Sequence, residues 1–387
     1  MDDVPLIDHH CHGVVTNDLD RPAFERLISE SFDPPPPGTT QFDSPFGLAV
    51  RRWCAPVLDL EPFSSPDDYI AKRAELGADE VARRFLNEAG LGALLIDTGY
   101  RSTELHDLDS MRTLSTKPVH EIVRLEVIAE SVAASGVDAA GYHAAFAAAL
   151  DEACRDAVGL KTIVAYRGGF DFDPEPPSGE DVAQAAGWFI EEVEGGRSRL
   201  TDQVLLRHGI WTGARLARER GLPIQFHVGW GDPDLTLHQT NPSLLTGLIR
   251  LLDAEDVNVA LLHCYPFHRV AGYLAAMFAN VYFDVGSALH FHGPSSATLL
   301  AEAMEVAPFS KLLYSSDAFG VAEGYHLGAL LYRQALSAVL DRWIAEGHCD
   351  AATAERIAKN IGSANARRIY PMPNGQAGAE ADADASA

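Results

Sequence analysis

Short runs of apolar and β-branched residues recur along the chain, and each run ends on polar residues or glycine. Runs of about four to eight such residues are typical of buried strands. Eight strands are predicted in this way, over residues 4–12, 91–98, 122–128, 160–166, 223–228, 257–264, 280–285 and 311–316.

Segments with helical periodicity separate most of these runs. They cover residues 66–89, 138–157, 204–220, 242–253, 270–278 and 295–306. Alternating strands and helices predict an α/β protein with a parallel sheet, and eight such units predict a (β/α)8 TIM barrel. A doubly wound open sheet is the alternative, but no glycine-rich GxGxxG turn follows any of the strands.

Two connections are longer than a simple crossover needs. Residues 13–90 contain the stiff stretch "DPPPPG" (33–38) and a helical part, so we expect a helical insertion that caps the carboxyl ends of the strands. The second connection, residues 167–221, follows the fourth strand and lies on the same face. We expect one barrel domain over residues 1–371, and a disordered acidic tail over residues 372–387.

Composition narrows the class of protein. Apolar residues make up 47% of the 387 residues, which is enough for a large core, and the net charge of −25 argues against nucleic-acid and anionic-membrane partners. Five scattered cysteines without a CxxC pair favour a reducing compartment. With no secretory leader or membrane span expected, the sequence predicts a cytoplasmic protein with a small-molecule substrate, and leaves a homodimer open.

The first predicted strand ends in the polar stretch "DHHCHG", residues 8–13. Alternation along a strand places Asp8, His10 and His12 on one face, and His9 and Cys11 on the other. Two imidazoles at this spacing can reach one metal ion. The alternative is a polar strand end whose histidines are satisfied by hydrogen bonds.

Other strands also end in polar residues, and in a barrel these ends meet at one mouth. The residues concerned are Asp97, Glu126, Tyr166, Arg167, His227, His263, Asp284 and Asp317. Single buried histidines are usually core residues, but histidines or aspartates at the ends of strands one, five, six and eight favour a metal site.

This arrangement resembles the amidohydrolase superfamily, in which HxH follows strand one, histidines follow strands five and six, and an aspartate follows strand eight. The stretches "GLKTIVAYRGG", "FHVGWGDPDL", "LLHCYPFHR", "YSSDAFG" and "NARRIYP" are similar to the amidohydrolase-related (amidohydrolase 2) branch. Within it they look most like the N-terminal domain of FluG and nodulin-type proteins that are fused to glutamine synthetase. The resemblance spans about residues 4–371.

The resemblance implies that His10, His12, His227 and Asp317 hold one divalent ion, Zn²⁺ by preference, with Mn²⁺ or Fe²⁺ as alternatives. Such an ion makes hydroxide available near neutral pH, and Asp317 would accept the proton. His263 would polarise the attacked carbonyl or protonate the leaving group.

Other residues have supporting roles to test. Asp8 is expected to orient an imidazole, with a structural hydrogen bond as the alternative, while His9, Cys11 and Cys264 are expected to face away from the ion and pack against helices. Binuclear relatives bridge two ions with a lysine on strand four. Lys161 is placed near the start of that strand, toward the wrong end of the barrel, so a mononuclear site is predicted.

The candidate substrate-binding residues are Arg167, Tyr166, Glu126, Trp230 and Asp232. Arg167 could bind a substrate carboxylate in a bidentate pair, or it could form an ion pair with Asp171 or Asp173. Glu126 could face either the barrel or the helices. The pair His290 and His292 copies the HxH spacing but lies in a predicted loop, where substrate contact is favoured over metal ligation.

Three functions fit these features. The first is a metal-dependent hydrolase of a C–N amide bond in a small carboxylated substrate, with a γ-glutamyl amide as the candidate that the resemblance suggests. The second is a non-oxidative decarboxylase or isomerase on the same scaffold. The third is a binding protein without activity, which the complete set of expected ligands disfavours.

Overall fold

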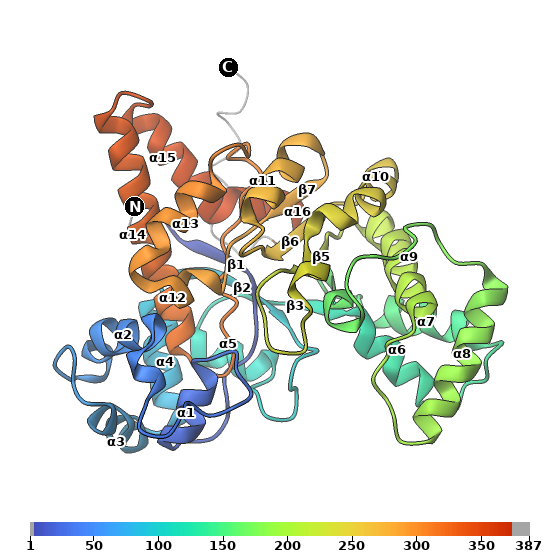
Figure 1. Cartoon of the computed structure of the whole chain (residues 1–387), viewed down its shortest axis with the longest axis horizontal. Coiled ribbons are helices and arrows are strands. Elements are labelled where there is room, and N and C mark those ends of the chain that lie inside the picture. Colours follow the sequence, from blue (N-terminus) through green and yellow to red (C-terminus); the bar gives the residue numbers. More distant parts are fainter. Residues whose placement is uncertain (1–3, 374–387) are drawn as a thin grey trace.

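The structure is a computed structural model that describes residues 4–373, and its centre is one curled sheet of seven parallel strands (Figure 1). The strands are β1 Leu6–Cys11, β2 Leu91–Asp97, β3 Val119–Arg124, β4 Gly159–Thr162, β5 Ile224–Val228, β6 Val259–His263 and β7 Val281–Phe283. They pair in chain order from β1 to β7. A doubly wound sheet reverses its strand order at a switch point, so the consecutive order excludes that alternative.

The segment predicted as the eighth strand is extended chain rather than a regular strand. Leu313 donates a backbone hydrogen bond of 2.9 Å to Phe283 in β7, and His9 in β1 donates one of 3.2 Å to Tyr314. Asp317 N in turn donates to the carbonyl of His10 at 3.1 Å. This segment therefore bridges the two edges of the curled sheet.

Sixteen helices are assigned within residues 4–373. They are α1 Arg21–Leu27, α2 Pro45–Ala49, α3 Pro66–Leu76, α4 Ala78–Glu88, α5 Leu108–Ser115, α6 Leu125–Ala133, α7 Tyr142–Ala153, α8 Gly179–Glu194, α9 Gln203–Arg220, α10 Thr246–Ala254, α11 His268–Met277, α12 Ala288–His292, α13 Ser296–Ala303, α14 Glu323–Ala345, α15 Ala351–Lys359 and α16 Asn365–Ile369. Side-chain caps start several of them; the Asp202 carboxylate, for example, accepts from the backbone of Val204 and Leu205 at the start of α9.

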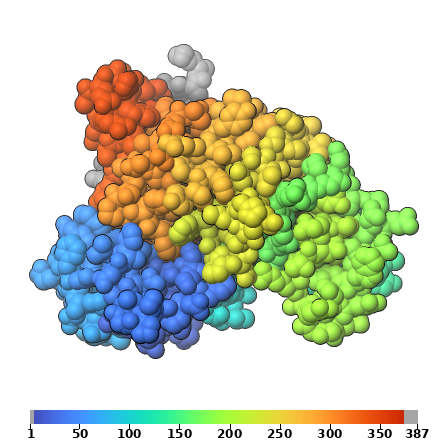
Figure 2. Space-filling view, viewed as in Figure 1, coloured from blue at the N-terminus to red at the C-terminus, as the bar shows by residue number. Residues whose placement is uncertain are grey.

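The long segment between β1 and β2 is helical, as predicted, but the helix expected over residues 66–89 is divided into α3 and α4. Gly77 separates them with φ of 81°, a conformation that favours glycine. Tyr69 and Arg73 of α3 both donate hydrogen bonds to the buried carboxylate of Glu323, which ties this segment to α14. Figure 2 shows the segment, in blue, and the green region of α8 at opposite ends of the molecule.

The third strand was predicted out of place. Residues 122–128 were expected to form it, whereas β3 ends at Arg124 and α6 begins at Leu125. No glycine, proline or asparagine separates the two elements, so their apolar residues read as one run. The buried positions Leu125, Ala129 and Val132 repeat every three to four residues, which is the helical period.

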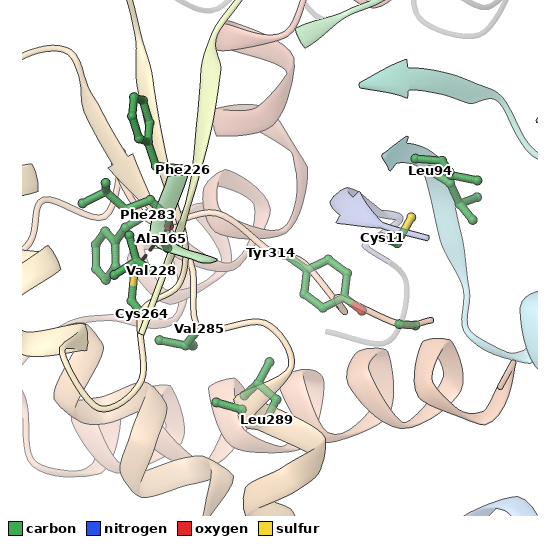
Figure 3. Close-up of a cluster of buried hydrophobic side chains, with 14 of the residues drawn as sticks. Cys11, Leu94, Ala165, Phe226, Val228, Cys264, Phe283, Val285, Leu289 and Tyr314 are labelled. Carbon is green, nitrogen blue, oxygen red and sulfur yellow. Dashed lines mark hydrogen bonds between the residues drawn. The ribbon is translucent and has the colours of Figure 1, made fainter. Parts of the chain in front are cut away.

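The sheet lies between two hydrophobic clusters. A small one includes Ile7, Ile122 and Tyr370, and a larger one packs the strands against the helices. Figure 3 shows part of the larger cluster, where Cys11 lies near Leu94. Cys264 also belongs to it, so both cysteines pack away from the barrel mouth as predicted.

Two expectations concern the ends of the chain and membranes. The acidic tail over residues 372–387 lies, from residue 374 onward, outside the described residues. Among residues 4–373, no helix combines the length and apolar character that crossing a bilayer requires.

Candidate metal centre

The strand ends bring five of the predicted site residues together. Asp317 Oδ1 lies 3.2 Å from His10 Nε2 and 3.7 Å from His12 Nε2, and Asp317 Oδ2 lies 3.2 Å from His263 Nδ1. The His227 ring is 4.7 Å from the His263 ring. Side chains from β1, β5, β6 and the segment after β7 thus converge at one end of the sheet.

Unusual backbone conformations help to place these side chains. His263 has φ of 68° and Asp317 has φ of 50°, in the left-handed region that non-glycine residues rarely adopt. The His263 N–H is held by Asp284 Oδ1 at 2.9 Å. Such strain is characteristic of functional sites, where the surrounding structure maintains it.

The histidines are suited to ligate a metal because they are neutral. Burial lowers the pKa of His10, His227 and His263 well below that of an ordinary imidazole, and lowers the pKa of His12 to about 3. Burial also raises the pKa of the Asp317 carboxyl. A divalent ion bound among these groups would favour the ionised carboxylate.

Hydrogen bonds set which ring nitrogen faces the centre. His10 Nδ1 donates to Gln225 Oε1 at 2.9 Å, and His12 Nδ1 donates to the carbonyl of Asp97 at 3.1 Å. Both imidazoles therefore present the lone pair of Nε2 toward Asp317. Such partners fix the tautomer and orientation of metal-binding histidines.

Two groups of donor atoms are compact enough for an ion, each within 4.8 Å. One comprises His10, His263 and Asp317, and the other comprises His10, His12 and Asp97. His227 is in neither group, but its Nε2 is buried and has no hydrogen-bond partner among the described residues. Mixed nitrogen and oxygen donors fit Zn²⁺, Mn²⁺ or Fe²⁺, while the number and identity of the ions stay predictions.

Lys161 is not at the wrong end of the barrel, as the sequence had suggested. Its Nζ lies 2.9 Å from His10 Nε2 and 3.7 Å from Asp97 Oδ2. The reason is that β4 ends at Thr162 and the chain then turns through a 3-10 helix, Val164–Arg167. Lys161 is thus the last residue but one of its strand, and the argument from its position for a single ion fails.

Asp97 forms a buried ion pair beside the centre. Arg124 donates to Asp97 Oδ2 from Nη2 at 2.6 Å and from Nε at 3.1 Å. Burial would raise the pKa of the Asp97 carboxyl, but Arg124 and Lys161 outweigh it and hold that pKa below its usual range. Asp97 is therefore ionised, and the positive charge near it is partly compensated.

Of the two roles predicted for Asp8, the structure shows the structural hydrogen bond, and His9 bonds to polar side chains where packing against helices was expected. Asp8 accepts hydrogen bonds from the backbone N and the hydroxyl of Ser316, and no described imidazole bonds to it. His9 bonds instead to Asp284 Oδ2 and to the Tyr370 hydroxyl, both at 2.8 Å. Pairing of β1 with β2 is irregular between Asp8 and Cys11, so the strict alternation that the prediction used does not hold there.

A pocket opens over the centre, with roughly 750 Å³ of space free of atoms, part of it continuous with solvent. It is lined by His12, Lys161, His227, His263 and Asp317 together with the predicted substrate-binding residues Tyr166, Arg167, Trp230 and Asp232. Of the predicted helical cap, Glu30 contributes to this lining. The other cap residues do not line it, so a covering role for them stays a prediction.

The structure does not bring Glu126 to this pocket. It lies in the first turn of α6, and its Oε1 accepts from Thr162 Oγ1 at 2.6 Å and from the backbone of Ile163 at 2.9 Å. Glu126 therefore fixes the end of β4 rather than contacting a ligand. Its position was predicted wrongly because residues 122–128 were predicted as the third strand.

Arg167 lines the pocket and forms an ion pair, but with Glu130 at 3.1 Å instead of Asp171 or Asp173. Its Nε is buried and has no hydrogen-bond partner among the described residues. Burial lowers the pKa of this guanidinium. Arg167 thus has a donor available for a ligand.

His290 and His292 lie on the short helix α12 and not in a loop. Side chains two residues apart diverge on a helix, so the HxH spacing does not create a site there. His290 packs against Phe46, with ring centroids 4.7 Å apart, and His292 Nδ1 bonds to the carbonyl of Ala288. Neither lines the pocket.

Sequence reasoning missed several residues of the site. Gln225 could have been found, because it precedes His227 by two positions and so shares its strand face. Arg124 was hidden by the misplaced third strand. Glu30 comes from the long β1–β2 segment, and nothing in its local sequence indicates the pocket.

Comparison with known proteins agrees with this geometry. A family model described as amidohydrolase matches residues 102–372. Protein fluG of Emericella nidulans is 25% identical over 402 residues, covering 95% of this chain and 46% of that protein. The chain thus spans about half the length of this relative.

Solved structures share the fold. A protein of Lactobacillus casei ATCC 334 that carries the provisional name metal-dependent hydrolase is 28% identical, with a TM-score of 0.82 and 95% of each chain covered. A uronate isomerase from Thermotoga maritima is 12% identical, with a TM-score of 0.60, 96% of this chain and 95% of that chain covered. At that identity the second likeness shows the fold alone.

Proposed function

The chain belongs to the amidohydrolase family, and from this and the geometry of the centre we propose that it is a metal-dependent hydrolase that cleaves a C–N amide bond. The observation that carries the proposal is the convergence of His10, His12 and His263 on the Asp317 carboxylate at the floor of a pocket. The provisional name of the L. casei protein supports it.

The residues support a division of roles. A divalent ion held by His10, His12, His227 and Asp317 would supply a Lewis acid and lower the pKa of water. Asp317 is placed to accept a proton, because its carboxylate lies among the imidazoles at the pocket, 3.2 Å from both His10 Nε2 and His263 Nδ1. His263 faces the same carboxylate and is placed to pass that proton to the leaving amine.

The proposed substrate is a small amide that carries a carboxylate. Arg167 supports this choice, because it lines the pocket and its buried Nε has no hydrogen-bond partner among the described residues. A γ-glutamyl amide is the candidate that we favour, and the similarity to fluG motivates it. We also propose Zn²⁺ as the ion and the cytoplasm as the compartment.

The test uses purified protein stripped with a chelator and reloaded with Zn²⁺, Mn²⁺ or Fe²⁺. Amine release from a panel of γ-glutamyl and other carboxylated amides is expected from the reloaded protein, and from neither the stripped protein nor Asp317→Asn. Because uronate isomerases share the fold, uronates and aromatic acids are assayed in parallel. Isomerisation or release of carbon dioxide without any amide cleavage would replace the proposal with the isomerase or decarboxylase alternative.

A further inference from the structure

One part of the pocket lining is acidic and aromatic, and the proposed metal chemistry does not use it. This wall consists of Glu30 from the β1–β2 segment, Tyr100 after β2, Tyr166 after β4, and Asp232 after β5. It adjoins the metal centre, because the Tyr166 ring is 4.5 Å from the His227 ring and the Tyr100 ring is 5.1 Å from the His12 ring.

Neither carboxylate of this wall forms an ion pair with any residue between positions 4 and 373. Glu30 makes no hydrogen bond or ion pair with another residue in the part of the chain that the structure describes. Asp232 accepts a hydrogen bond from the backbone of Asp234 at 2.9 Å. Arg199, the guanidinium that lies nearby, bonds instead to Asp234 Oδ2 at 2.8 Å and to the carbonyl of Tyr166 at 3.1 Å.

This arrangement is unfavourable without a ligand. Burial and the neighbouring Asp232 raise the pKa of Glu30 to about 7, and burial also raises the pKa of Asp232. Two partly buried carboxylates at one wall repel each other. A cation bound between them would remove the repulsion and provide the missing partner.

The aromatic rings indicate which kind of cation. Tyrosine and tryptophan faces attract organic ammonium groups, whereas a hydrated metal ion prefers several oxygen ligands. Tyr100, Tyr166 and Trp230 all line the pocket beside the two carboxylates. The wall therefore fits an ammonium group better than a second inorganic ion.

A second observation also indicates a ligand in this pocket. Arg167 lines it, and its buried Nε has no hydrogen-bond partner among the described residues. The Cβ of any residue replacing Gly231 would lie 2.1 Å from the Tyr166 hydroxyl and 3.0 Å from His227 Nε2. The absence of a Cβ at Gly231 thus lets the Tyr166 hydroxyl and the His227 ring pack against its backbone, which holds the wall next to the centre.

We propose that Glu30 and Asp232 bind the primary ammonium group of the substrate, while Arg167 binds its carboxylate. The substrate class is then an amide of an amino acid that keeps a free ammonium and a free carboxylate. This inference rests on the proposed hydrolase function for its reaction, and its binding site is tested separately.

The test compares L-glutamate with glutarate, which differ in the ammonium group alone. Their Kd values are measured by calorimetry on zinc-loaded protein from which free metal has been dialysed. L-Glutamate is expected to bind at least tenfold more tightly to the wild type. In Glu30→Gln and Asp232→Asn this preference should fall toward one, while glutarate binds as before or more tightly.

The control variant is Glu61→Gln, the same chemical change at an exposed acid of the same segment, and it should keep the preference. Equal binding of the two acids to the wild type, binding of neither, or an equal loss of both in Glu30→Gln would overturn the inference. A glutamate preference without any amide cleavage would contradict the proposed function alone. Equal cleavage of γ-glutamyl and glutaryl amides would contradict the inference alone.

Discussion

At the residue scale, the centre depends on groups that would touch neither ion nor substrate. Gln225 is one of them, because its Oε1 accepts from His10 Nδ1 while its Nε2 donates to the Tyr370 hydroxyl at 2.9 Å and to the carbonyl of His9 at 2.8 Å. The amide thus holds one imidazole in the tautomer that exposes Nε2. A sequence pattern can suggest that His10 is a ligand. It does not show that Gln225 bonds to His10, because that contact joins residues far apart in the sequence.

Replacing Gln225 tests that role. Gln225→Ala is expected to weaken zinc binding about 10- to 100-fold, because His10 loses the acceptor that orients it. Gln225→Glu keeps an acceptor at the same place and should restore most of the affinity. Chelator competition measures the affinity for zinc. Thermal unfolding of the zinc-free proteins shows whether the substitution also changes the stability of the fold. Equal zinc affinity in wild type and Gln225→Ala would show that the hydrogen bond does not orient the ligand.

The raised pKa of Glu30 predicts that replacing this residue stabilises the protein, and that the gain in stability depends on pH. Its pKa is raised from 4.5 to about 7 by burial and by Asp232, so ionising it costs the folded state free energy that grows as pH rises from about 4.5 to 7. Glu30→Gln removes that cost, and should stabilise the protein by roughly 1–3 kcal/mol at pH 8 and by much less at pH 4.5. Urea unfolding at both pH values measures the difference. The same gain at both would mean that the carboxylate charge is not its source.

At the element scale, the ends of the strands decide which residues reach the pocket. The sequence predicted strands one, two, five and six closely, because each is a compact apolar run with a clear polar end. It misjudged β4, whose apolar run continues through the 3-10 helix Val164–Arg167, and this displaced Lys161 in the prediction. It also merged β3 with α6, which displaced Glu126.

The loop after β5 gives a prediction of its own. A methyl group at Gly231 would lie against the Tyr166 hydroxyl and His227 Nε2, so Gly231→Ala should lower kcat/KM for the amide substrate about 10- to 100-fold. Gly179 starts α8 and serves as the matched control, because a methyl group added there would meet no atom within 4 Å. Gly179→Ala should leave kcat/KM unchanged, with both variants checked by circular dichroism. Full activity in Gly231→Ala would contradict a role for the positions of Tyr166 and His227 in turnover.

At the scale of the whole molecule, the site exists because the chain closes on itself. His10 and Asp317 are joined by a backbone hydrogen bond across more than three hundred residues, and Lys161 and His263 arrive from strands between them. The alternation of strands and helices was enough to predict the parallel sheet and the convergence of polar strand ends. It could not predict the irregular pairing in β1 or the contribution of Glu30, because both depend on contacts between distant segments.

The most direct test of the account is the zinc content of the protein at equilibrium. Wild-type protein dialysed against micromolar zinc is predicted to retain at least one equivalent per chain by elemental analysis. Asp317→Asn and the double variant His10→Ala/His12→Ala should retain less than a tenth of that, while Glu61→Gln matches the wild type. A metal centre at these residues would be contradicted if the variants of His10, His12 and Asp317 retained as much zinc as the wild type. It would also be contradicted if the wild type retained no zinc.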